Sequence, residues 1–180
     1  MESGNFGEIR SNHFHGGLDF KTGGVTGKPV RALADGYISR IRVTNGSGYV
    51  LDVCYHNGYS TINRHLSGFI SPIAERVEKL QYENENWEVE IIPEPDEYPV
   101  KAGQQIAWSG NTGYSFGPHL HLDVFETETG DYVDPMPFFK TKIKDTRAPK
   151  ADGIMFFPQL GKGVVDGKQE NKMILPNTGR

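Results

Sequence analysis

Polar and apolar residues alternate along residues 118–125, Pro-His-Leu-His-Leu-Asp-Val-Phe, with the period of a half-buried β-strand. In such a strand His119 and His121 point to one face, and the neighbouring leucine and valine side chains point to the other. The rise per residue places the Cα atoms of the two histidines about 6–7 Å apart. One imidazole could then bind a metal ion while the other acts on what the metal holds. The alternative is a solvated strand face carrying two unrelated histidines.

The same kind of pattern predicts several more short strands, separated by Gly-containing turns, at residues 37–43, 49–55, 59–66 and 105–108. The strand at 59–66 delivers His65 at its end. The dipeptide Asp35-Gly36 favours a tight hairpin between the two strand patterns that flank it. Alternation within 37–43 places Ile41 on the same face as Tyr37. Many short strands joined by turns indicate a mainly β fold.

One helix is predicted, at the start of an insertion that spans about residues 71–98. Ser71 is expected as its N-cap, with Pro72 at the first helical position. Ile73, Val77 and Leu80 then form a narrow apolar stripe. Acidic residues outnumber basic ones from Glu75 to Glu97. This excess favours a solvated insertion, and the alternative is a groove wall that attracts a cationic ligand.

Composition limits the classes of function and the number of domains. The chain has 180 residues and a formal net charge of −4, so nothing favours nucleic-acid binding. No apolar run is long enough to cross a bilayer, and the N-terminus lacks a signal-peptide pattern. Cys54 is the single cysteine, which excludes an internal disulfide and indicates a structural thiol. We expect a first domain over residues 1–140, then a linker at 145–149 and a C-terminal β extension, or the start of a second domain, within 141–180.

Residues that can bind a metal are dense near the N-terminus. His15 and Asp19 are spaced as they would be on one helix face, but Gly16-Gly17 between them disfavours a helix. A loop that runs into a strand, with Asp19 at the strand's start, is therefore predicted.

Together with His65, His119 and His121, these residues supply the donor types of a catalytic zinc site, in which three protein ligands leave a position for water. Two further histidines near that water could take its proton and stabilise an oxyanion. This inventory fits metal-assisted hydrolysis of an amide. A structural zinc site is less favoured because Cys54 is alone, and no Gly-x-Ser-x-Gly elbow supports a serine hydrolase. The strand pattern leaves open which of His119 and His121 is the ligand.

The motifs His15-x-x-x-Asp19, His65-Leu66 and His119-x-His121, in this order, resemble those of the lysostaphin-type zinc endopeptidases, which cut peptide cross-links in bacterial cell walls. The phrases Gly-Lys-Pro-Val-Arg-Ala-Leu-Ala-Asp-Gly, Gly-Gln-Gln-Ile-Ala-Trp-Ser-Gly-Asn-Thr-Gly and Gly-Pro-His-Leu-His-Leu agree as well, so the resemblance covers about residues 6–140.

The resemblance implies an antiparallel β-sheet core of the duplicated hybrid motif type, with a groove across the sheet. It implies one Zn²⁺ per chain held by His15, Asp19 and His121, and makes His119 and His65 the catalytic pair. It also implies peptidoglycan stem or cross-bridge peptides as substrate and a location in the cell envelope, the periplasm or the medium. We expect a monomer. One departure is Asn63, where the family usually has a tyrosine.

Other residues receive weaker interpretations. Arg10 precedes the first metal-capable histidine, and we expect its guanidinium to contact substrate carboxylates. His13 is expected to be partly exposed, and His56 to lie in a turn. A family member that only binds the cell wall or activates another hydrolase is the alternative function. A closed structural site, with His13 as a fourth ligand, is a third hypothesis.

Overall fold

The computed structural model describes residues 2–10, 13–95, 97–139, 143 and 152–175. The chain divides into two compact units, Met1–Ile143 and Lys144–Arg180. The linker predicted at 145–149 lies outside the described residues, and the domain limit at residue 140 stays a prediction.

The described part of the larger unit is built on an 11-stranded sheet in which all paired strands are antiparallel. This confirms the mainly β, antiparallel fold class. Its elements, in chain order, are β1 (Glu2–Gly4), β2 (Gly17–Lys21), β3 (Pro29–Arg31), β4 (Gly36–Thr44), β5 (Gly48–Tyr55), β6 (Tyr59–Phe69), α1 (Ile73–Glu83), β7 (Val89–Ile91), β8 (Pro99–Val100), β9 (Gln105–Ser109), β10 (His119–Glu126), β11 (Tyr132–Val133) and α2 (Met136–Phe139).

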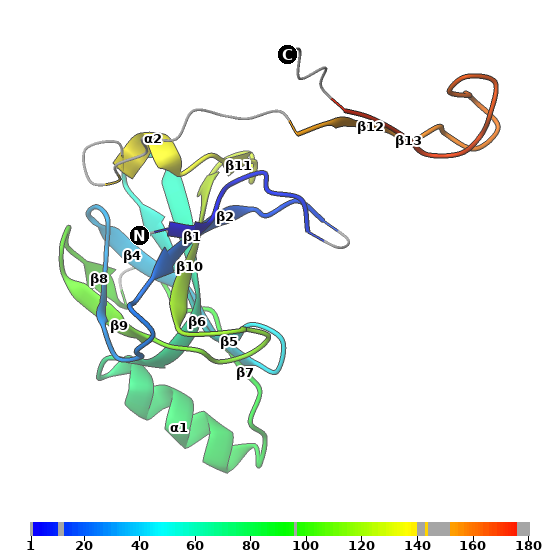
Figure 1. Ribbon diagram of the computed structural model, residues 1–180. Coiled ribbons are helices and arrows are strands. Elements are labelled where there is room, and N and C mark those ends of the chain that lie inside the picture. Colours follow the sequence, from blue (N-terminus) through cyan, green and yellow to red (C-terminus); the bar gives the residue numbers. More distant parts are fainter. Residues whose placement is uncertain (1, 11–12, 96, 140–142, 144–151, 176–180) are drawn as a thin grey trace. The chain divides into compact units, whose positions relative to one another are not determined.

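The strand that carries the two histidines lies inside the sheet. The main order of strands is β1-β2-β10-β6-β5-β4-β7, so β10 is hydrogen-bonded to β2 on one side and to β6 on the other (Figure 1). The strand predicted at residues 118–125 is confirmed. In the register of these pairs, His121 lies opposite Asp19 on β2 and opposite Arg64 on β6. Segments far apart in the sequence thereby place their side chains on one face.

The apolar core holds this sheet in place. β9 pairs with both β3 and the end of β6, and its side chains meet those of β4, β5 and β6 in one cluster. Ile41, Leu51, Leu66 and Ala107 are completely buried in this cluster. Burying a leucine or isoleucine side chain stabilises the fold by about 1.5–3 kcal/mol, so the core keeps the opposite face of the sheet in a fixed geometry.

Two expectations for the first strands are wrong. Asp35-Gly36 does not form a hairpin, because β3 pairs with the distant β9 while β4 pairs with β5. The β4–β5 ladder shifts register between Ile38 and Arg40. A bulge changes which face the following residues occupy, so Ile38 joins Ile41 in the core and Tyr37 does not share their face.

Helix α1 lies where the apolar stripe predicts it, against β6 and β7, with Ile73 and Val77 buried. The expected N-cap is wrong. The N-cap position is Pro72, which has no capping side chain, and the Ser71 hydroxyl instead donates to the Glu75 carboxylate.

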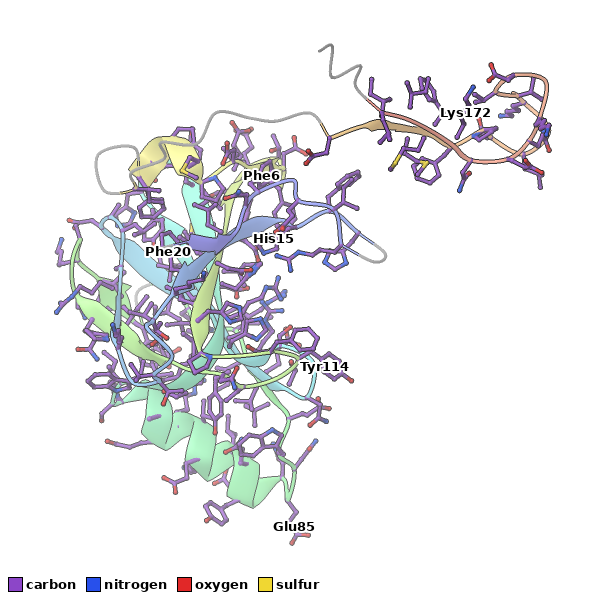
Figure 2. The ribbon with its side chains drawn as sticks, in the orientation of Figure 1. Phe6, His15, Phe20, Glu85, Tyr114 and Lys172 are labelled. Atoms are coloured by element: carbon purple, nitrogen blue, oxygen red, sulfur yellow. The ribbon has the colours of Figure 1, made fainter. Side chains whose placement is uncertain are left out.

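The acidic insertion is only partly solvated. Its strand β7 pairs with β4, and the side chains of Val89 and Ile91 on β7 are buried. The residues between α1 and β7 are exposed, including Glu85, which follows α1 (Figure 2). A short charged segment with two apolar residues at alternate positions has thus added an edge strand to the sheet.

The smaller unit contains β12 (Ile154–Phe156) and β13 (Lys172–Ile174), which pair as an antiparallel hairpin with exposed side chains. Among the described residues, no helix is long and apolar enough to span a membrane.

Candidate metal centre

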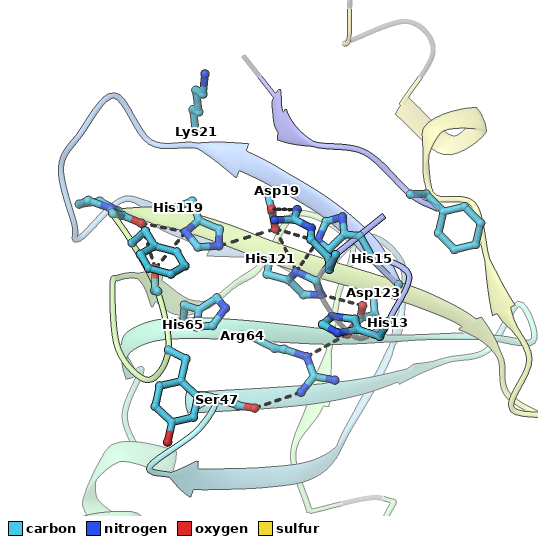
Figure 3. Close-up of a pocket in the computed structure, with 18 of the residues that line it drawn as sticks. His13, His15, Asp19, Lys21, Ser47, Arg64, His65, His119, His121 and Asp123 are labelled. Carbon is cyan, nitrogen blue, oxygen red and sulfur yellow. Dashed lines mark hydrogen bonds and ion pairs between the residues drawn. The ribbon is translucent and has the colours of Figure 1, made fainter. Parts of the chain in front are cut away.

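His15, Asp19 and His121 converge on one point of the sheet face (Figure 3). The atoms His15 Nε2, Asp19 Oδ1 and His121 Nδ1 all lie within 4.8 Å of one another. His121 Nδ1 is 2.9 Å from the Asp19 oxygen and 3.0 Å from His15 Nε2. Two imidazole nitrogens and a carboxylate oxygen are a donor set that suits Zn²⁺. The residues therefore fit a zinc ion with three protein ligands.

The backbone explains how this group forms. Asp19 lies in the middle of β2, because the strand begins at Gly17 and not at Asp19 as expected from the sequence. Its register with β10 places it beside His121. His15 belongs to the loop before β2, and its Nδ1 donates to the carbonyl oxygen of Asn5 at 2.8 Å. That bond leaves His15 Nε2 directed at the other two side chains.

The other two predicted histidines lie beside this group. The ring centroids of His65 and His119 are 4.8 Å apart, and His119 Nε2 is 3.6 Å from the Asp19 oxygen. His65 Nδ1 is 2.9 Å from the carbonyl oxygen of Thr112, and His119 Nδ1 is 2.8 Å from that of Gly117. A carbonyl can only accept, so both Nδ1 atoms carry the proton and both Nε2 atoms are left for other partners.

The position of His65 differs in detail from the prediction. It lies within β6, not at its end, and its φ of 59° is left-handed. The β5–β6 ladder shifts register between Tyr49 and Leu51, the part of β5 opposite this point. With this irregular backbone, the imidazole of His65 lies beside His119 and His121 of β10.

Electrostatics differ among these side chains. Burial acts to raise the pKa of Asp19, but hydrogen bonds and charges from His121 and His15 outweigh it and hold that pKa far below its usual range. Burial acts to lower the pKa of His121, yet the carboxylates of Asp123 and Asp19 raise it to about 9. Burial also lowers the pKa of His65, against the opposing hydrogen bond to Thr112. His65 is consequently neutral near pH 7.

Comparison with known proteins supports the resemblance. No family model matches the chain. The glycyl-glycine endopeptidase ALE-1 of Staphylococcus capitis is 35% identical over 136 residues, which are 72% of this chain and 30% of that protein. The catalytic domain of the antimicrobial peptidase lysostaphin from Staphylococcus simulans superposes with a TM-score of 0.57 at 28% identity, covering 78% of this chain and 92% of that domain. The chain belongs to the lysostaphin-type peptidase family.

A zinc-containing peptidase from Vibrio cholerae also shares the fold of this lysostaphin-type chain, with a TM-score of 0.54 at 26% identity over 76% of this chain and 36% of that one. The chain spans about a third of the length of its curated relative ALE-1.

The residue that departs from the lysostaphin-type pattern, Asn63, faces away from the histidines. Its side chain is buried, and its amide donates to the carbonyl oxygen of Leu51 at 3.1 Å. Arg64, the next residue, lines the groove instead. This departure therefore concerns packing inside the sheet and not the face that carries the histidines.

The histidines open into a groove lined by the N-terminal loop and by the loop before β10. Tyr114, labelled in Figure 2, and Phe116 belong to the latter loop; both are exposed and line the groove. Arg10 and His13 also line the groove, and Arg10 Nη2 donates to the second oxygen of Asp19 at 3.2 Å. His56 lies in the turn between β5 and β6, as predicted.

Two groove residues were missed by the sequence reasoning. Asp123 Oδ1 is 2.7 Å from His121 Nε2, and Asp123 Oδ2 accepts a hydrogen bond from Arg64 Nε at 2.9 Å. A signal for Asp123 was present, since it continues the alternation of His119 and His121 on one strand face. No sequence pattern indicated that Arg64 contacts Asp123, because that contact depends on the pairing of β10 with β6.

Proposed function

We propose that this chain contains a zinc-dependent endopeptidase that hydrolyses the peptide cross-links of bacterial peptidoglycan. The observation that carries the proposal is the convergence of His15, Asp19 and His121, with two more histidines beside them whose Nδ1 protons are held by backbone carbonyls. The relative ALE-1 is named a glycyl-glycine endopeptidase, and one structural neighbour is described as containing zinc. We propose one Zn²⁺ per chain and a monomer.

His15, Asp19 and His121 would hold the Zn²⁺ ion and leave it accessible to water or substrate. When bound there, zinc lowers the pKa of a water molecule toward about 7 and polarises a carbonyl oxygen. Asp19 is suited to hold the cation because its low pKa keeps it ionised at any neutral pH. Two neutral imidazoles and one carboxylate leave the cation a net positive charge for this chemistry.

His119 and His65 are proposed as the catalytic pair. Each donates its Nδ1 proton to a backbone carbonyl, so each presents Nε2 to the reacting groups. One Nε2, when unprotonated, takes the proton of the attacking water and later gives it to the leaving amine. The other, when protonated, donates a hydrogen bond to the oxyanion of the tetrahedral intermediate. The low pKa of His65 favours its neutral form in the resting enzyme.

The substrate would lie in the groove as an extended peptide from a stem or a cross-bridge. We propose that the enzyme acts where such peptides occur, in the cell envelope, the periplasm or the medium. We keep Arg10 as a proposed substrate contact, since its side chain is 38% exposed at the groove. Its ion pair with Asp19 means that a substrate carboxylate would share the guanidinium with that residue.

The test combines zinc content with cleavage of purified cell walls, with and without a chelator. The wild-type protein is expected to contain zinc and to release peptide fragments that disappear when the metal is removed. His119→Ala should keep its zinc and lose cleavage, whereas His56→Ala, in a turn outside the groove, should keep both. Zinc binding without cleavage by the wild-type protein would contradict the proposal and indicate a cell-wall-binding member. Mass analysis of fragments from defined substrates would identify the bond that is cut.

A further inference from the structure

Behind the proposed ligand His121 lies a buried carboxylate on the same strand. Asp123 is two residues further along β10, so the two side chains share one face. Asp123 Oδ1 is 2.7 Å from His121 Nε2, and the residue is only 2% exposed. A carboxylate oxygen accepts, so His121 Nε2 carries the proton and Nδ1 is the ring atom directed at Asp19 and His15.

The second oxygen of this carboxylate is held from the neighbouring strand. Arg64 on β6 donates from Nε to Asp123 Oδ2 at 2.9 Å, and from Nη1 to the hydroxyl of Ser47 at 3.2 Å (Figure 3). Arg64 lies directly opposite His121 in the β10–β6 register. A carboxylate buried to this extent requires such partners. The Nε–H of Arg64 and the Nε2–H of His121 therefore fix the position of the Asp123 carboxylate from two sides.

The structure assigns Asp123, held by Arg64, as a positioning residue for His121. It selects the tautomer of His121 that carries its proton on Nε2 and so leaves Nδ1 available to bind the metal. This inference rests on the proposed function, because it takes His121 as a zinc ligand. The carboxylate holds the proton at Nε2 and fixes the plane of the ring. Without it, the imidazole could protonate at Nδ1 or rotate, and its lone pair would leave the point where His15 and Asp19 converge.

Asp123→Asn separates this role from simple packing. Both partners of Asp123, Arg64 Nε and His121 Nε2, are donors, and an asparagine has only one acceptor oxygen. One of the two contacts must be lost although the shape of the side chain is kept. We expect the dissociation constant for zinc to rise about 10–100-fold, the usual effect of losing an outer-shell partner.

Asp52→Asn is the matched control. Asp52 is also buried in this sheet, on β5, and accepts two hydrogen bonds from Arg42 at 2.7 and 2.9 Å. It contacts no proposed ligand in the described structure. Losing this ion pair should lower the free energy of unfolding, as Asp123→Asn should, and leave the zinc dissociation constant unchanged.

Competition with a chromophoric chelator gives the dissociation constants, and thermal unfolding shows that each variant is folded. Independently of any variant, long-range ¹H–¹⁵N spectra of the zinc-loaded wild type should show the His121 proton on Nε2. A proton on Nδ1, wild-type zinc affinity in folded Asp123→Asn, or an equal loss in Asp52→Asn would overturn the assignment. A wild-type protein that binds no zinc would overturn the proposed function and this inference with it.

Discussion

His65 combines a proposed catalytic role with a backbone conformation that its side chain disfavours. Its φ of 59° lies in the left-handed region, within a strand whose neighbours are extended. For a residue with a Cβ atom this conformation costs about 1–2 kcal/mol, and glycine is free of that cost. We predict that His65→Gly is more stable than His65→Ala, although both lose the same hydrogen bond to Thr112.

His119 provides the reference for the magnitude. It lies in β10 with an ordinary negative φ, so glycine there should be less stable than alanine by about 0.5–1 kcal/mol. The larger conformational entropy of glycine in the unfolded chain affects both positions alike and cancels in the comparison. At each position we subtract the free energy of unfolding of the alanine variant from that of the glycine variant. This glycine-minus-alanine difference should be more positive at position 65 than at position 119 by about 1–2 kcal/mol.

Urea unfolding of the four variants in excess chelator measures these free energies without a contribution from bound metal. Cell-wall cleavage should be lost in all four, since each lacks one of the two imidazoles proposed to be catalytic. Equal glycine-minus-alanine differences at the two positions would refute the reasoning. The left-handed backbone of His65 would then impose no cost on the fold.

Three further outcomes are expected. Because the pKa of His121 is about 9, zinc must displace a proton from its imidazole below that pH. The apparent association constant for zinc should therefore rise about tenfold per pH unit from about pH 6 to 8. A pH-independent association constant would argue against this. Gly17→Ala should lose about 1–3 kcal/mol in urea unfolding, since its Cβ would lie 2.2 Å from the carbonyl oxygen of Leu122. Gly68→Ala, in β6 with open space around it, should instead gain about 0.5–1 kcal/mol. Arg10→Lys should raise KM for carboxylate-bearing peptides because an ammonium lacks the planar fork of donors, and an unchanged KM would exclude the substrate contact.

Sequence patterns over a few consecutive residues correctly predicted those helices and strands whose buried face is set by local periodicity. The alternation around His119 and His121 predicted β10, and the stripe of Ile73 and Val77 predicted the buried face of α1. These predictions succeed because the period of side-chain direction is a property of a few consecutive residues. The motifs also carried the family resemblance, which the comparisons support.

Only the tertiary structure decided which strands pair and which side chains come into contact. Asp35-Gly36 has the sequence of a hairpin turn, yet β3 pairs with β9 because burial of Val30 against the distant Ala107 outweighs the local preference. The left-handed backbone of His65 and the contact of Asp123 with Arg64 likewise depend on register between strands. Such register arises from contacts between residues distant in the chain, and no local period encodes them. The amino-acid sequence thus determined which side chains this protein has for its chemistry, and the pairing of β2, β10 and β6 determined that they meet.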